Sequence, residues 1–140
     1  MDSETCSGRK QAFRKGWAFL YMFDFLLKHA VVDTDDTGLR TFTHERMKVF
    51  AKFTAKDCLV CKMLGPAFGQ LAEAGARQNI LFLRLNSNEN PVARQLMNER
   101  AAPFFVSYCQ GRISECNTCE TEAEMMAQFE RLQHLMPQTA

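Results

Sequence analysis

The order in which short apolar strands alternate with helical segments restricts this chain to a mixed α/β fold. Residues 47–54 place an apolar side chain at every second position, from Met47 to Phe53, which predicts a strand. Residues 80–85 are dense in apolar side chains and too short for a helix, which predicts a buried strand. Helical patterns follow them, from about Cys58 to Arg77 and over residues 91–100. We therefore expect a central mixed sheet with helices on both faces.

The segments around these elements complete the expected sheet. Residues 104–108 and 112–116 flank a Cys-Gln-Gly turn, which predicts a hairpin. A short strand is expected at residues 30–32, a short helix at residues 39–45 and a closing helix at residues 121–136. The whole pattern predicts an α/β domain over residues 30–136, with a tail at residues 137–140.

An N-terminal extension, residues 1–29, precedes this domain. Residues 9–29 are apolar around most of the girth of a predicted helix, which we expect to pack on the domain, with a partner or a membrane surface as alternatives. Its longest apolar run, residues 16–27, is interrupted by Asp24 and falls short of the roughly twenty residues of a membrane span. Lys28 follows where a signal peptide would have its cleavage site, so we expect neither a span nor a cleaved secretory signal.

Length and charge exclude several classes of protein. The 140 residues have room for one domain. Seventeen Lys and Arg against sixteen Asp and Glu leave a net charge of +1, without the positive excess that nucleic-acid binding needs. Six cysteines are too few for a disulfide-dense secreted scaffold. The cysteines therefore either carry chemistry or pack as small apolar side chains.

Cys58 and Cys61 lie where a predicted strand hands over to a predicted helix. A thiol in the first helical turn meets unpaired N–H donors and the positive end of the helix dipole, which favours the thiolate. Cys61 lies one turn further on, within reach for a disulfide, and Lys62 follows it. This placement favours redox chemistry, although a bare Cys-x-x-Cys motif also allows metal binding or simple packing.

Several motifs together resemble the thioredoxin family in their order and spacing. They are Phe50-Ala51-Lys52-Phe53, Cys58-Leu59-Val60-Cys61-Lys62-Met63, Pro66 and Ala102-Pro103-Phe104-Phe105. The resemblance covers about residues 30–136 and implies a thioredoxin fold, here with an extra N-terminal helix. The segment that ends in Cys116-Asn117-Thr118-Cys119 is most similar to the atypical cysteine- and histidine-rich thioredoxins of plant and algal plastids.

The resemblance implies a thiol–disulfide oxidoreductase that acts on protein disulfides. Cys58 would be the attacking nucleophile and Cys61 the resolving thiol of a mixed-disulfide mechanism. Ala102 and Pro103 would form a cis peptide that holds an extended substrate by its backbone. The implied partners are disulfide-bearing proteins and an external reductase or small thiol, with no cofactor and no metal.

Two charged residues beside the motif need separate interpretation. Lys52 stands where the family normally has a buried carboxylate that helps to deprotonate the resolving thiol. Either its ammonium stabilises a Cys61 thiolate, or it reaches solvent while only its aliphatic stem is buried. Asp57 precedes Cys58, and its negative charge disfavours the thiolate.

Cys116 and Cys119 form a second Cys-x-x-Cys pair with three interpretations. They are an auxiliary redox pair that brings a third thiol near Cys58, inert cysteines, or metal ligands together with Cys58 and Cys61. The separation between the pairs far exceeds the roughly 15–20 residues of compact zinc ribbons, which weighs against zinc or an iron–sulfur cluster.

The sequence thus predicts an oxidoreductase, with two rivals. One is a metal- or cluster-binding module that uses both cysteine pairs, and the other is a redox-inert interaction domain of the same fold. Reduced thiols suit a cytoplasmic location, with the plastid stroma as the alternative.

Overall fold

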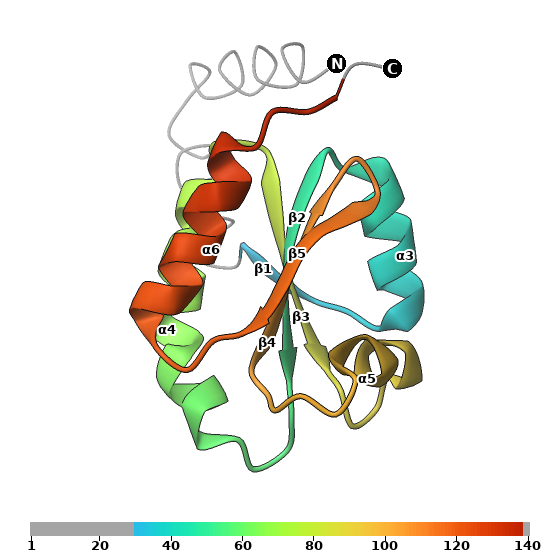
Figure 1. The fold of residues 1–140 in the computed structure, drawn as a ribbon, viewed down its shortest axis with the longest axis vertical. Coiled ribbons are helices and arrows are strands. Elements are labelled where there is room, and N and C mark those ends of the chain that lie inside the picture. The colour runs from blue at the N-terminus through green and yellow to red at the C-terminus, as the bar shows by residue number, and fades with distance from the viewer. Residues whose placement is uncertain (1–29, 139–140) are drawn as a thin grey trace, which may run out of the picture.

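The structure is a computed structural model that describes residues 30–138. The extension at residues 1–29, with its predicted aromatic-rich helix, lies outside the described residues, as do residues 139–140. Within the described range the chain forms a central sheet between two layers of helices (Figure 1). This arrangement confirms the predicted fold class.

The sheet has five strands in the order β1-β3-β2-β4-β5. Their bounds are Val31–Asp33 for β1, Lys48–Thr54 for β2, Ile80–Asn86 for β3, Phe104–Cys109 for β4 and Arg112–Thr118 for β5. Strands β1, β3 and β2 run parallel, whereas β4 and β5 are antiparallel to their neighbours. The sheet is therefore mixed, and β2 lies at its centre.

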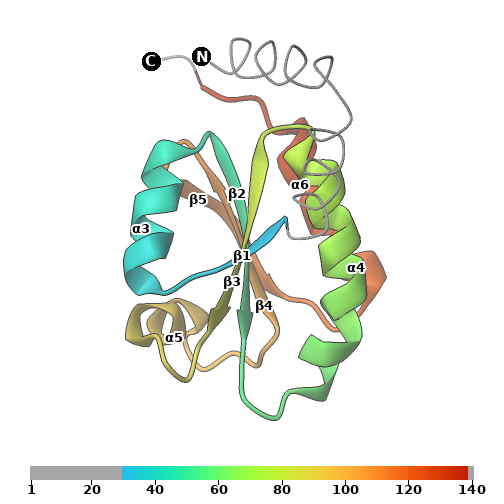
Figure 2. The ribbon, with the colours of Figure 1, turned by 180° about the vertical axis from the view of Figure 1, so that it is seen from behind.

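Two helices cover each face of the sheet. Their bounds are Asp36–Glu45 for α3, Leu59–Ala76 for α4, Pro91–Met97 for α5 and Glu122–His134 for α6. Figure 1 and the reverse view in Figure 2 show α4 and α6 on one face and α3 and α5 on the other. The βα connections of the parallel strands thus place helices on both sides, as parallel pairing requires.

Two helix ends differ from the predicted ones for local reasons. Helix α3 begins earlier than residue 39 because the Asp35 carboxylate caps it and accepts a hydrogen bond from the Gly38 N–H at 2.8 Å. The prediction that the helix from residue 91 extends to residue 100 was wrong, because α5 ends at Met97. Asn98 adopts a left-handed φ of 47°, a conformation that terminates helices.

The core consists of two apolar layers, one on each face of the sheet. On the face covered by α4 and α6, the ring of Phe50 contacts the rings of four other phenylalanines at centroid distances of 5.3–6.0 Å: Phe68, Phe82, Phe105 and Phe129. Phe50 is fully buried. This packing holds β2 rigidly and so positions the loop that leaves its carboxyl end.

Gly75 in α4 offers a direct test of this packing. A Cβ atom built on Gly75 would lie 2.5 Å from Cε1 of the buried Phe82 ring, so the helix and β3 would have to move apart. We expect Gly75→Ala to lower the free energy of unfolding by about 2 kcal/mol, as measured by urea denaturation.

Gly69 in the same helix is the matched control. No atom lies within 4 Å of its built Cβ, so Gly69→Ala should raise the free energy of unfolding by up to about 1 kcal/mol. The same change in stability for both substitutions would contradict the proposed close contact between α4 and β3.

Candidate active site

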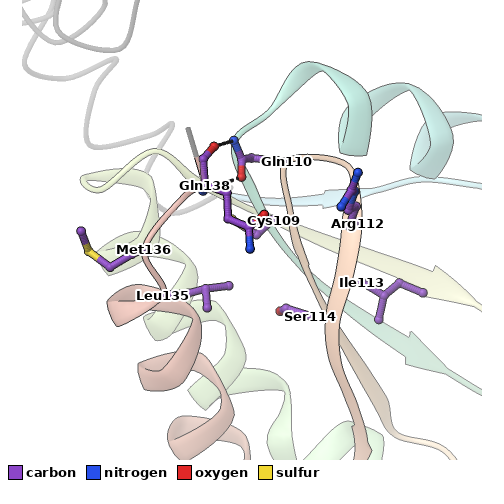
Figure 3. A pocket seen from close by; sticks show the side chains of 8 residues that line it. All are labelled: Cys109, Gln110, Arg112, Ile113, Ser114, Leu135, Met136 and Gln138. Atoms are coloured by element: carbon purple, nitrogen blue, oxygen red, sulfur yellow. Dashed lines mark hydrogen bonds between the residues drawn. The ribbon is translucent and has the colours of Figure 1, made fainter. Parts of the chain in front are cut away.

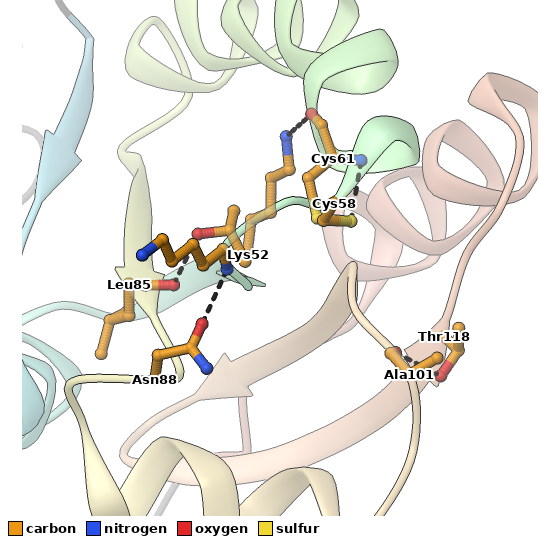
Figure 4. Close-up of a disulfide and its surroundings, with 9 residues drawn as sticks. Lys52, Cys58, Cys61, Leu85, Asn88, Ala101 and Thr118 are labelled. Atoms are coloured by element: carbon orange, nitrogen blue, oxygen red, sulfur yellow. Dashed lines mark hydrogen bonds between the residues drawn. A yellow bond between two sulfur atoms is a disulfide. The ribbon is translucent and has the colours of Figure 1, made fainter.

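A disulfide joins Cys58 and Cys61 where the chain leaves β2 and enters α4 (Figure 4). Cys58 is the N-cap residue of α4, and its Sγ accepts a hydrogen bond from the Cys61 N–H at 3.1 Å. The first turn of α4 contains no acidic residue. The sulfur of Cys58 therefore meets the N–H donors and the positive end of the helix dipole, a setting that favours a thiolate after reduction.

The two cysteines differ in their access to solvent. Cys58 is half-buried, whereas Cys61 is 6% exposed and lies behind it. Leu59 and Met63, beside Cys58 on α4, are 71% and 65% exposed. A partner can thus reach Cys58 more readily than Cys61.

The predicted substrate-binding peptide lies at the same end of the sheet as the disulfide. The Ala102–Pro103 bond is cis, and it immediately precedes β4. Phe104, the next residue, pairs with Phe53 near the carboxyl end of β2, shortly before the chain reaches Cys58. Strand register therefore brings the cis peptide and the disulfide to one end of the sheet.

Hydrogen bonds hold the loop that leads into Cys58. The Thr54 hydroxyl donates to the Leu85 carbonyl at 3.2 Å, and the Lys56 N–H donates to Asn88 Oδ1 at 2.7 Å (Figure 4). Asp57 then turns the chain with a left-handed φ of 60°, and its side chain is exposed. Lys62, in the first turn of α4, is exposed as well. Both predicted auxiliary residues thus lie beside the disulfide at the surface.

Lys52 lies below the disulfide and is buried along its whole length. It is 2% exposed, and its Nζ donates a hydrogen bond to the Cys61 carbonyl at 2.9 Å (Figure 4). The ammonium also lies 5.3 Å from the centroid of the Phe68 ring. Burial, with a smaller contribution from Arg84, lowers the pKa of Lys52 to about 8. The alternative of a solvated ammonium was wrong, because the Lys52 side chain is enclosed between β2 and α4.

The second cysteine pair does not come together. Cys116 lies within β5, whereas Cys119 comes directly after the last residue of that strand, Thr118. Cys116 packs against the apolar layer under α3 and α5, whereas Cys119 belongs to the layer under α4 and α6. This geometry does not support an auxiliary redox pair.

Cys119 is a buried core thiol with a defined partner. Its Sγ donates to Gln128 Oε1 at 3.6 Å, and Gln128 Nε2 donates in turn to the Phe105 carbonyl at 3.1 Å. Burial, aided by Glu124, raises the pKa of Cys119 to about 11, so its thiol stays protonated at neutral pH. Gln128 was not predicted as part of this network, because a single amide in the predicted closing helix carries no distinctive signal in the sequence.

The metal-binding rival requires four cysteines to converge. Among residues 30–138, no group of three or more Cys, His, Asp or Glu side chains is arranged to hold a metal ion. The opposed directions of Cys116 and Cys119 explain why these two do not join Cys58 and Cys61.

A hollow of about 390 Å³ lies away from the disulfide (Figure 3). It is formed by the β4–β5 turn and the segment after α6, where Gln110 and Gln138 exchange hydrogen bonds of 2.6 and 2.8 Å. Cys109 lines it and pairs with Lys48, the first residue of β2, so it lies at the opposite end of the sheet from Cys58. This hollow is not part of the redox site.

A dithiol pair at a helix N-terminus, next to a cis-proline loop on an α/β sheet, defines a thiol–disulfide oxidoreductase. A sequence profile of the thioredoxin family matches residues 30–131. The chain belongs to the thioredoxin family, and the Cys58–Cys61 disulfide is its redox centre.

Solved structures of thioredoxins share the fold. Thioredoxin from Malassezia sympodialis is 22% identical with a TM-score of 0.66, and the match covers 74% of this chain and 94% of that one. Spinach chloroplast thioredoxin f, in its short form, is 18% identical with a TM-score of 0.67 and the same coverage of both chains. Mitochondrial thioredoxin 3 of Saccharomyces cerevisiae is 19% identical with a TM-score of 0.65, covering 74% and 97%. At these identities the likeness establishes the fold alone.

Two further searches, one for similar curated sequences and one for membrane-spanning helices within residues 30–138, found no match. No curated protein sequence is significantly similar to this chain. None of the helices within residues 30–138 has the length and apolar character to cross a membrane.

Proposed function

We propose that this thioredoxin-family protein reduces disulfides of partner proteins and is recharged by an external dithiol reductase or small thiol. The observation that carries the proposal is the asymmetry of the disulfide. The half-buried Cys58 is open to a partner, whereas Cys61 is shielded and lies within bonding distance of the Cys58 sulfur.

The reaction balances in two exchange steps. The Cys58 thiolate attacks one sulfur of the partner disulfide, a Cys58–partner disulfide forms, and the other partner sulfur leaves as a thiolate that takes up a proton. The Cys61 thiolate then attacks the Cys58 sulfur, the Cys58–Cys61 bond forms, and the second partner sulfur leaves. The partner gains two electrons and two protons, and the external reductant restores the dithiol.

The reductant and the compartment are proposed from two separate observations. A thioredoxin f2 that is 23% identical to this chain has been solved in complex with ferredoxin:thioredoxin reductase, and this supports a dithiol reductase as the reductant. Among the described residues, Cys109, Cys116 and Cys119 are free thiols, and Cys58 and Cys61 form the disulfide. Free thiols suit a reducing compartment, so we propose a cytoplasmic location, with the plastid stroma as the alternative.

Trapping with Cys61→Ser tests the proposal and identifies the substrate. Without the resolving thiol, Cys58 should remain joined to its partner, so the purified variant should retain proteins that dithiothreitol releases and mass spectrometry identifies. The Cys58→Ser/Cys61→Ser double variant keeps the other cysteines and should retain none of them. Equal capture by both variants would contradict an attack by Cys58.

A further inference from the structure

Lys52 is a buried cation that forms no ion pair with any of the residues 30–138 that the structure describes. Its described neighbours are the Cys61 carbonyl and the Phe68 ring on α4, Arg84 across from it on β3, and Phe105 across from it on β4. Among residues 30–138, neither of the described ion pairs involves Lys52. Asp33 on β1 pairs with Arg84 on β3, and its carboxylate accepts hydrogen bonds of 2.6 and 2.9 Å from the Arg84 guanidinium.

A buried charge is costly unless an opposite charge compensates it. Reduction of the disulfide makes such a charge available, because it yields two thiols and the loss of a proton converts a thiol into a thiolate. The sulfur of Cys61 is separated by only a few covalent bonds from the carbonyl oxygen that Lys52 contacts at 2.9 Å. A thiolate on Cys61 would therefore form on the residue that Lys52 already contacts, and a nearby opposite charge favours ionisation.

We propose that Lys52 is the counter-ion of the Cys61 thiolate and promotes the second half of the reaction. At that stage Cys58 is held in the mixed disulfide and is uncharged, so Cys61 carries the only thiolate of the redox pair. Lys52 is a positioning residue, since it acts through Cys61 and touches neither the substrate nor the bond that breaks. The proposal rests on the mixed-disulfide function proposed above.

The protons and electrons balance for either charge state of Lys52. When Lys52 is an ammonium ion, the proton of Cys61 leaves to solvent, and when it is neutral, its amine accepts that proton. Burial lowers the pKa of Lys52 to about 8, so both states occur near neutral pH. Each route yields the same ammonium–thiolate pair, and the thiolate then attacks the Cys58 sulfur and expels the partner thiolate.

Exchange with one equivalent of an aromatic disulfide, 5,5′-dithiobis(2-nitrobenzoate), separates the two halves of the reaction in the reduced full-length protein. Attack by Cys58 releases one coloured thiolate, and resolution by Cys61 releases the second. We expect Lys52→Met to slow the second release by about tenfold at neutral pH and to move its pH midpoint up by about one pH unit. The first release should change by less than about twofold.

Lys52→Gln separates charge from hydrogen bonding, because glutamine keeps an N–H donor but carries no charge. If the charge acts, Lys52→Gln should behave like Lys52→Met. Lys48→Met is the matched control, since Lys48 lies on the same face of β2 and its Nζ donates to the Gln133 carbonyl at 3.0 Å, at the other end of the strand. This control should leave both releases unchanged.

Three results would overturn the counter-ion role. They are a wild-type second release in Lys52→Met, a wild-type second release in Lys52→Gln, or an equal slowing of both releases. Failure of the underlying function looks different, because the wild-type protein would then show no second release beyond that of Cys61→Ser. The Cys58→Ser/Cys61→Ser double variant measures the background from the remaining cysteines.

Discussion

Replacing Cys58 by serine should reduce insulin-disulfide reduction with dithiothreitol to the rate of dithiothreitol alone. A serine hydroxyl is not ionised at neutral pH and cannot form a disulfide, so the first exchange step is lost. Cys61 does not replace it, because it is 6% exposed and lies behind Cys58. The turbidity of precipitating insulin chains measures the rate.

Cys116→Ser is the control for this experiment. Cys116 packs on the opposite face of the sheet from Cys61 and Cys119, so this substitution should leave the rate unchanged. Identical rates for the wild-type protein and Cys58→Ser would mean that the insulin is not reduced through this site. The redox-inert interaction domain would then be the better description.

Lys52→Met should raise the stability of the oxidised protein at neutral pH. Folding lowers the pKa of Lys52 from 10.5 to about 8, which corresponds to a cost of about 3 kcal/mol for the charged form. Methionine has a similar length, carries no charge and can pack against the Phe68 ring. We therefore expect the free energy of unfolding in urea to increase by up to about 3 kcal/mol at pH 7.

The pH dependence of this gain has a defined sign. Below pH 8, Lys52 is protonated in both the folded and the unfolded chain, so the full cost is present. Between pH 8 and 10.5 the folded protein has released a proton that the unfolded chain still binds, so wild-type stability rises with pH. The advantage of Lys52→Met should therefore shrink across this window.

Comparison of the two proteins at each pH removes other titrations. Burial raises the pKa of Tyr108 to about 12, which lowers stability above pH 10 in both proteins alike. Lys48→Met, which removes a half-buried lysine at the other end of β2, should show no comparable gain. A constant difference between Lys52→Met and the wild-type protein from pH 7 to 10.5 would contradict a buried charge at Lys52.

The elements that local sequence patterns predicted best are strands with regularly placed apolar side chains. The alternation over residues 47–54 and the apolar run at residues 80–85 correspond to β2 and β3 within a residue. The end of α5 was missed because Asn98 stops it through its own backbone conformation, which side-chain periodicity does not report. The second cysteine pair was ambiguous because the Cys-x-x-Cys spacing brings two thiols together at the start of a helix, whereas here Cys116 lies in β5 and Cys119 directly after it, in different layers of the core.

The sequence by itself determined the position of Cys58 at the start of a helix, the position of Cys61 one turn later, and the order of strands and helices. Those properties depend on neighbours along the chain. Only the tertiary structure decided that Lys52 is buried and contacts the Cys61 carbonyl, and that Cys119 lies in the core. It also decided that Pro103 lies at the same end of the sheet as the disulfide. Each of these depends on strand register and helix packing between residues far apart in the sequence, because these long-range contacts determine which side chains are buried and which charges lie close together.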